Sequence, residues 1–185
     1  MKKLAIMSML ILAVLCIFPA FAGNRPTISF NGQQYYLAKT HYQTDYTRSP
    51  VNLVEFYILE GENSDNFTKS IQRITFLQIT DYKPSLKSRL SEFKEDNKNI
   101  PFEEIIQDNK AILNVTFWWP FRPTVIYKNV IVFQQDKVAN RAMCYIVTEL
   151  QFFDSIKTTN ADLVKQGSQL LLSNKIVEEA AKLSF

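Results

Sequence analysis

The segment from 102 to 153 alternates strand-type runs with short polar turns and shows no helical period. IPFEEIIQ and AILNVTFWW flank a turn at 108–110, and TVIYKNVIVFQQ and ANRAMCYIVTELQFF flank a second turn near Asp136-Lys137. Strands joined by such short turns must pair antiparallel, because parallel neighbours need a crossover of a dozen or more residues. A doubly wound sheet would also need helices between its strands. The segment therefore predicts consecutive antiparallel hairpins.

The rest of the chain is predicted to add strands and helices to these hairpins. Asn31-Gly32 within TISFNGQQYYL is the strongest hairpin signal, since a type I′ turn needs two residues at positive φ. VNLVEFYILEGE predicts a strand that stops at Gly61, and RITFLQIT predicts another. We therefore expect a single antiparallel sheet of about six to seven strands, mostly hairpins.

Three segments predict helices. In NSDNFTKSIQ, at 63–72, Asn, Ser and Asp residues suit a helix cap. DYKPSLKSRLSEFKEDNKN places Pro84 at a first helical position, followed by a narrow apolar stripe. The tail, 160–185, predicts a long helix capped by Asn160, with Leu163, Leu170 and Val177 on one face. The expected fold class is therefore α+β, with two to three helices packed against the sheet, including a long C-terminal helix.

The N-terminus has the pattern of a secretory signal peptide. Lys2 and Lys3 precede an apolar run over 4–18, and Ala20-Phe21-Ala22 is a typical cleavage site. The run of 15 residues is shorter than the ~20 that a transmembrane helix needs. We expect residues 1–22 to be removed after Ala22 and residues 23–185 to form one domain. The alternatives are an uncleaved membrane anchor and a lipoprotein anchor on Cys16, which is disfavoured because Leu15 precedes it where a small residue is usual.

Removal of residues 1–22 changes the charge and the cysteine content. Two lysines leave with the signal, so the net charge falls from +3 to +1, and Cys144 is the one cysteine that remains. No intramolecular disulfide can then form, and Cys144 is expected to be a small buried hydrophobe. A nearly neutral surface carries no electrostatic footprint for nucleic acid. The signal and the lack of disulfides favour a periplasmic or secreted protein of a Gram-negative bacterium.

The stretch FWWPFRP, at 117–123, is the candidate binding site. The alternation in AILNVTFWW predicts that the odd-numbered residues, Trp119 included, point inward. Trp118 would then point to the other side, with Asn114 and Thr116, and a binding surface would consist of Trp118, Phe121 and Arg122. The partner would be an envelope protein or an apolar ligand, meeting this stretch or a sheet edge. The competing interpretation is that these rings cover the end of the core.

Catalytic motifs are missing from the sequence. His41 is the one histidine, and no nucleophile elbow, phosphate loop or zinc motif is present. We therefore expect no catalytic residue, no cofactor and no metal site, and favour a non-enzymatic binding or accessory role. The alternative is a secreted hydrolase that uses His41 or a carboxylate pair, such as Glu103 with Glu104 or Glu60 with Glu62.

Two further expectations concern membranes and assembly. A peripheral membrane protein would insert Trp118 and Phe121 and hold Arg122 at the lipid headgroups, although a charge of +1 helps little. No transmembrane segment is expected in 23–185. The protein is expected to be a monomer or a weak homodimer.

One segment resembles a protein family. In NLVEFYILEGENSDNFTKSIQRITF, at 52–76, a strand ends in Gly61-Glu62 and the step Asn66-Phe67-Thr68 follows. This is similar to small secreted proteins of Gram-negative bacteria in which an Asn-aromatic-Thr step opens a short helix; the aromatic residue there is often Trp. More loosely, the order of strands and helices resembles the PsbP-like α+β fold. The resemblance implies an accessory or binding role in the cell envelope and brings no catalytic residues.

Overall fold

The computed structural model describes residues 25–44, 51–76, 94–95, 102–107, 110–118, 122, 124–136, 141–152 and 167–184. These residues form one antiparallel sheet of eight strands and a short C-terminal helix. The strands are β1 (Thr27–Phe30), β2 (Gln33–Thr44), β3 (Val51–Leu59), β4 (Lys69–Phe76), β5 (Phe102–Gln107), β6 (Lys110–Trp118), β7 (Val125–Asp136) and β8 (Arg141–Phe152). The 3₁₀-helix η1 (Gly167–Leu170) and the α-helix α4 (Asn174–Ala181) follow.

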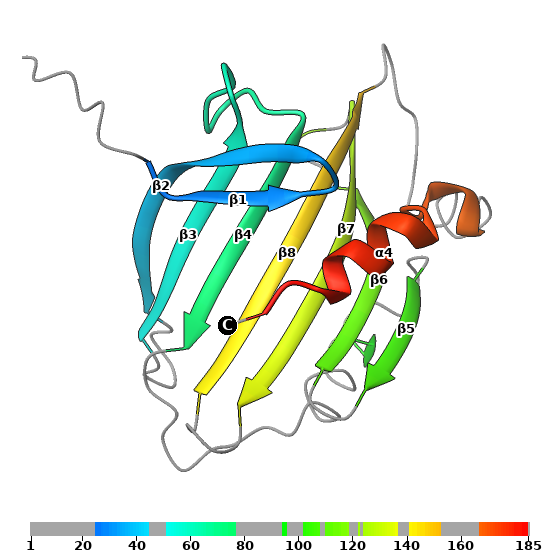
Figure 1. The fold of residues 1–185 in the computed structure, drawn as a ribbon. Helices are drawn as coiled ribbons and strands as arrows, with labels where there is room; N and C mark the ends of the chain where they lie inside the picture. Colours follow the sequence, from blue (N-terminus) through cyan, green and yellow to red (C-terminus); the bar gives the residue numbers. More distant parts are fainter. Residues whose placement is uncertain are drawn as a thin grey trace, which may run out of the picture.

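The sheet consists of two four-stranded meanders that meet in its middle. Its strand order is β1-β2-β3-β4-β8-β7-β6-β5, so every neighbouring pair except β4 with β8 is also consecutive in sequence (Figure 1). The β4–β8 ladder runs from Lys69 opposite Glu149 to Phe76 opposite Ala142. The outermost strands of the sheet are therefore β1, which covers only residues 33–36 of β2, and β5. All pairing between the two meanders passes through β4 and β8.

The predicted α+β class is wrong. The one α-helix whose bounds the structure gives is α4, which has eight residues, and the described chain is nearly all β. The sheet also has eight strands, where six to seven were expected. The middle helix predicted from Pro84 lies outside the described residues, except that Lys94 and Glu95 are helical.

The short helix predicted at 63–72 is a turn followed by strand β4. The Asn63 side-chain oxygen accepts hydrogen bonds from the backbone N–H groups of Asp65 (3.0 Å) and Asn66 (2.9 Å). This is the same local bonding that caps a helix, but here it closes a turn. From Lys69 onward the backbone pairs with β3 and β8, and these long-range ladders exclude a helix.

The long C-terminal helix predicted over 160–185 is interrupted. Leu172 lies between η1 and α4, where its backbone N–H donates to the Asn114 side-chain oxygen (3.1 Å) and its carbonyl accepts from the Asn114 amide nitrogen (2.8 Å). The Thr116 hydroxyl donates to the carbonyl of Leu170 (2.8 Å). Polar side chains of β6 therefore satisfy backbone groups that helical hydrogen bonds would otherwise use. Leu170 and Val177 are both buried, as their apolar spacing predicted.

Several local predictions are confirmed. Asn31 and Gly32 have φ of 46° and 72°, as a type I′ turn requires, and they join β1 to β2. Gly61, with φ of 83°, follows the end of β3. The two hairpins predicted between 102 and 153 are β5–β6 and β7–β8. Cys144 is buried and forms no disulfide.

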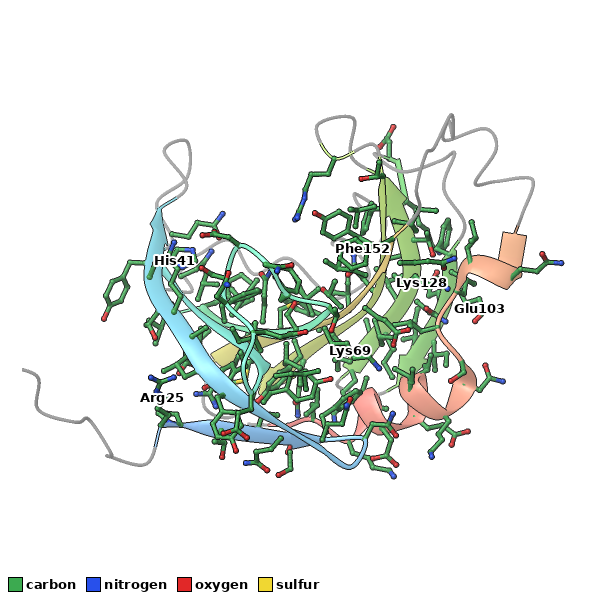
Figure 2. All side chains as sticks on the ribbon, turned by 90° about the horizontal axis from the view of Figure 1, so that it is seen from above. Arg25, His41, Lys69, Glu103, Lys128 and Phe152 are labelled. Atoms are coloured by element: carbon green, nitrogen blue, oxygen red, sulfur yellow. The ribbon has the colours of Figure 1, made fainter. Side chains whose placement is uncertain are left out.

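The main core lies between the sheet and the segments that cover one of its faces, which we call the helix face. Figure 2 shows a curved sheet with α4 and the β1–β2 hairpin on the outer side of the bend. Apolar side chains of the central strands pack there against Leu172, Val177 and Ala180. The buried residues contributed by the sheet and its hairpin are Phe30, Tyr35, Tyr57, Ile71, Ile112, Val130, Val132, Tyr145 and Val147.

Strand β6 is buried on both faces, which corrects the predicted alternation. All six residues from Ala111 to Thr116 are buried, whether odd or even in number. Asn114 and Thr116 lie on the helix face, beneath η1 and the start of α4. On the opposite face, Ala111 and Leu113 form a second cluster with residues of β5 and β7. The even-numbered side is therefore not the solvent side, because the C-terminal segment covers it.

Candidate functional site

The stretch predicted as a binding surface is described only in part. Trp118 is the last residue of β6, and its backbone pairs with Ile126. The side chain of Trp118, and Trp119 and Phe121 entirely, lie outside the described part of the structure. Arg122 is exposed, and its Nη1 donates a hydrogen bond to the hydroxyl of Tyr127 on β7 (2.9 Å). The proposed set of Trp118, Phe121 and Arg122 therefore stays a prediction.

The residues considered for hydrolysis are dispersed. His41 is exposed on β2, opposite Val54, and within the described ranges its side chain makes no hydrogen bond or ion pair. Glu103 and Glu104 are successive residues of β5, so their side chains point to opposite faces of the sheet. Glu62 Oε1 accepts hydrogen bonds from the backbone N–H (2.9 Å) and hydroxyl (2.5 Å) of Thr68. None of these groups meets another candidate acid or base at a common site.

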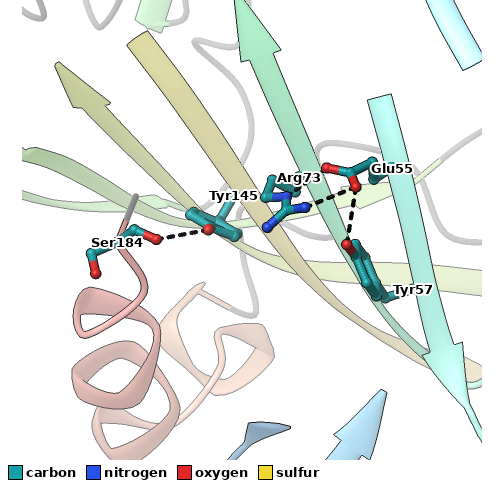
Figure 3. Close-up of polar contacts among 5 residues, drawn as sticks. All are labelled: Glu55, Tyr57, Arg73, Tyr145 and Ser184. Carbon is teal, nitrogen blue, oxygen red and sulfur yellow. Dashed lines mark hydrogen bonds and ion pairs between the residues drawn. The ribbon is translucent and has the colours of Figure 1, made fainter. Parts of the chain in front are cut away.

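A polar network joins β3 to β4 on the helix face, and a separate polar contact from β8 lies beside it (Figure 3). Arg73 holds Glu55 through two hydrogen bonds, Nε to Oε2 at 2.6 Å and Nη2 to Oε1 at 2.8 Å. The Tyr57 hydroxyl donates to the same carboxylate (3.2 Å), and the Arg73 guanidinium lies 5.7 Å from the Tyr57 ring centroid. The Tyr145 hydroxyl donates to the carbonyl of Ser184 (2.9 Å). This separate contact ties β8 to the C-terminal tail, and Tyr145 lies opposite Arg73 in the β4–β8 ladder.

Ionisation in this network follows from its geometry. The hydrogen bond from Arg73 lowers the pKa of Glu55 below its ordinary value of 4.5. Burial raises the pKa of Tyr57 to about 12. Both groups therefore keep one protonation state across the neutral range, Glu55 as the anion and Tyr57 as the neutral phenol. A general acid or base needs a pKa near the working pH, so this network is better suited to holding strands together than to proton transfer.

The outer edge of β5 exposes two adjacent isoleucines. Ile105 is 45% exposed and Ile106 is 59% exposed, on opposite faces of the same strand. At the other edge, β1 has four residues, exposes the polar Thr27 and Ser29, and covers only residues 33–36 of β2. The remainder of the β2 edge exposes mostly polar residues between 39 and 43. Natural proteins protect free edges with short strands and polar or charged residues, because an unpaired edge offers backbone hydrogen-bonding groups to another chain. Strand β1 has this protection, whereas β5 presents isoleucine.

A groove adjoins β5 on the helix face. It measures ≈ 220 Å³ and lies between α4 and the β5–β6 pair. Ile112 and Val177, both buried, supply apolar walls, and Asn114 lies beside them. Glu103 and Ile105 border the groove from β5, and Asn174 and Glu178 border it from α4. Asn174, Val177 and Glu178 share one side of α4 because residues three and four apart are neighbours on a helix.

The carboxylates around β5 differ in their partners. Glu104, on the face opposite the groove, forms an ion pair with Lys94. Glu103 has only a long contact from the Asn114 amide nitrogen (3.5 Å), and within the described chain neither Glu103 nor Glu178 pairs with a cation. The groove is therefore bordered by two carboxylates whose charge no described side chain balances, above apolar walls.

Sequence reasoning missed this site. The run FEEIIQ predicts a strand, and its acids, Glu103 and Glu104, suggest a carboxylate pair, but nothing in the run by itself indicates a groove. Two adjacent isoleucines in a strand must point to opposite faces, so one of them lies away from any single core. The adjacent isoleucines could therefore have indicated an exposed apolar residue on this strand. The contribution of α4 was not available, because it depends on where the tail folds back.

Among the described residues, no group of three or more histidine, cysteine, aspartate or glutamate side chains is placed to hold a metal ion. The described helices include none that has the length and apolar character needed to cross a membrane.

Comparisons with known proteins identify no relative. No protein-family model matches the chain, and neither the curated proteins nor the solved structures contain a significant match.

Proposed function

We propose that this chain is an exported, non-enzymatic binding or accessory protein of a Gram-negative cell envelope, periplasmic or secreted, and that it receives its partner at the outer edge of β5. The observation that carries the proposal is the exposure of Ile105 (45%) and Ile106 (59%) on an edge strand. Partner strands bind such edges by adding backbone hydrogen bonds to the sheet, and side chains on alternate positions supply specificity.

Export is supported by the N-terminal sequence. Lys2 and Lys3, the apolar run that follows, and Ala20-Phe21-Ala22 have the order of a cleavable signal. Mass spectrometry of the protein recovered outside the cytoplasm should give an N-terminus at Gly23. Recovery of only the full-length chain, in the cytoplasm, would contradict this part of the proposal.

Site-specific photocrosslinking in intact cells tests the binding edge. A photoreactive residue at Ile105 should give a discrete crosslinked product, and the change Ile106→Lys should weaken that product because it places a charge on the edge. Tyr42, which is 67% exposed on β2, is the matched control position and should give no such product. Equal products from positions 105 and 42, or none from 105, would count against β5 as the binding edge.

A further inference from the structure

The groove beside β5 has the size of a site for one side chain. Its ≈ 220 Å³ is below the ~300–1,000 Å³ of pockets that enclose drug-sized ligands. A single long side chain of a larger partner is the occupant that this volume suits. The groove also opens next to Glu103 and Ile105 of β5, the strand at which a partner would be added.

Strand geometry would bring such a side chain to the groove. A segment that pairs with β5 would lie ~4.8 Å away, with every second side chain on the helix face. A side chain on that face would stand directly beside Glu103 or Ile105. A long, flexible side chain would then reach across β5 towards Val177 and Glu178 of α4, which border the same groove.

Charge selects the chemistry of that side chain. Glu103 and Glu178 border the groove from two different elements, and within the described residues no cation balances either carboxylate. The walls formed by Ile112 and Val177 are apolar. Lysine combines an aliphatic stem, which packs along apolar surface, with a terminal ammonium that carboxylates attract. An acidic side chain would meet two like charges.

We propose that the partner of this protein is an extended basic segment, which pairs with β5 and places a lysine side chain in the groove between Glu103 and Glu178. The inference rests on the proposed function, since it assumes that β5 is a binding edge. It adds the chemical class of the partner: a protein or peptide segment in an extended conformation, with lysine on the helix face and apolar residues next to Ile105 and Ile106.

Peptide titration by calorimetry tests the inference on the purified protein. The probes are three peptides of about six residues, the usual length of a strand, with an alternating valine and threonine sequence and one central lysine, glutamine or glutamate. The lysine peptide should bind roughly fivefold more tightly than the glutamine peptide, and the glutamate peptide more weakly still. Raising the salt concentration should reduce the preference for lysine.

Substitutions distinguish the contribution of the groove to peptide binding from the contribution of the β5 edge. Glu103→Gln and Glu178→Gln should each reduce the preference for lysine over glutamine by about two- to threefold and leave binding of the glutamine peptide unchanged. Glu60→Gln, an exposed acid in the β3–β4 turn, is the matched control and should change nothing. Ile106→Lys should weaken binding of all three peptides.

Each result then has one meaning. If the three peptides bind equally and Ile106→Lys weakens them all, the lysine site is wrong and the β5 edge stands. If the lysine preference persists when Ile106→Lys has no effect, the groove stands and the edge proposal fails. Tighter binding of the glutamate peptide would show that the first-turn amides of α4 attract an anion, and it would overturn the inference. No binding of any peptide contradicts both proposals.

Analytical sedimentation of the protein alone tests whether a second copy of this protein occupies the β5 edge. A monomer is expected, because the proposed partner is another chain. A dimer that Ile106→Lys dissociates would place a second copy of this protein at β5 and overturn the basic-segment proposal.

Discussion

Asn114 is the residue on which the C-terminal segment most depends. Its side chain is 2% exposed and makes a two-way hydrogen-bond pair with the backbone of Leu172, at 2.8 and 3.1 Å. Leu172 lies between two helices, and the side-chain amide of Asn114 supplies the hydrogen bonds that its backbone would make inside a helix. Asn114 thus holds the tail against β6 at Leu172, next to the bond from Thr116 to Leu170, and α4 begins directly after this point.

Replacement of Asn114 should be costly. We expect Asn114→Ala to reduce the free energy of unfolding by about 3 kcal/mol, because it leaves both the N–H and the carbonyl of Leu172 buried without partners. Thr116→Val, which removes one hydrogen bond to Leu170, should cost only about 1 kcal/mol. Urea denaturation of the two variants measures the difference. Equal, small effects would mean that water reaches the Leu172 backbone.

Glu55 and Arg73 give stability a dependence on pH. Because Arg73 lowers the folded pKa of Glu55 below 4.5, the unfolded chain binds this proton more readily than the folded one. The contribution is complete above pH 4.5 and is lost as pH falls through the folded pKa. Glu55→Gln should therefore destabilise by about 1 kcal/mol near neutrality, and its deficit relative to the wild type should disappear in acid.

Urea denaturation of the wild type and Glu55→Gln between about pH 6 and pH 2 measures this convergence. Lys69→Met is the control, since the Lys69–Glu149 pair is more exposed, with side chains 34% and 36% accessible. It should change stability by less than about 0.5 kcal/mol. A Glu55→Gln deficit that stays constant down to acid pH would show that the ion pair contributes nothing beyond packing.

The turn between β3 and β4 is an element held by its own side chains. Glu62 accepts two hydrogen bonds from Thr68, and the Phe67 ring lies edge-on to Phe56 of β3, with centroids 5.2 Å apart. Gly61, at φ of 83°, supplies the conformation that starts the turn. The Gly-Glu and Asn-aromatic-Thr steps of the sequence are thus joined by the Glu62–Thr68 hydrogen bonds, which we call the clamp. Strand β4 begins directly after it, at Lys69.

Removal of the clamp should loosen this turn without unfolding the sheet. Glu62→Ala should cost about 1 kcal/mol, and Thr68→Val, which keeps the backbone donor, roughly half of that. Hydrogen exchange of residues 61–68 should accelerate in Glu62→Ala, while exchange in β8 stays unchanged. Glu60→Ala, at an exposed neighbouring position, is the control. An equal effect from Glu60→Ala would mean that charge, and not the clamp, orders the turn.

At the scale of the whole molecule, the two meanders depend on the central pair of strands. Ile71 and Val147 lie opposite each other in the β4–β8 ladder, and they are 0% and 3% exposed. Edge strands have one paired side and less burial. The free energy of local opening should therefore rise from β1 and β5 towards β4 and β8.

Native-state hydrogen exchange measures this gradient. The slowest amides should lie in β4 and β8 near Ile71 and Val147, and the fastest strand amides in β1 and β5. Addition of the lysine peptide should slow exchange in β5 and leave β1 unchanged, so β1 is an internal control. Protection of β5 equal to that of β8 in the protein alone would mean that the β5 edge is already covered.

The hairpins could be predicted because their causes are local. Asn31-Gly32 adopts positive φ for reasons contained in two residues, and alternating apolar residues separated by short turns leave antiparallel pairing as the simple solution. The helix expected at 63–72 failed because the same Asn63 bonding serves a turn as well as a helix. Pairing with β8, more than 70 positions further along, decided between them.

Local sequence accounts for the antiparallel hairpins, the turn at Asn31-Gly32, the turn at Gly61 after β3 and the burial of Cys144. Each follows from backbone preferences or from apolar character within a few residues. Long-range packing accounts for the burial of Asn114 and Thr116, for the break in the tail at Leu172 and for the position of Glu178 beside the β5 edge. The physical reason is that a polar side chain is buried only when a partner satisfies it, and the partner of Asn114 lies 58 positions away.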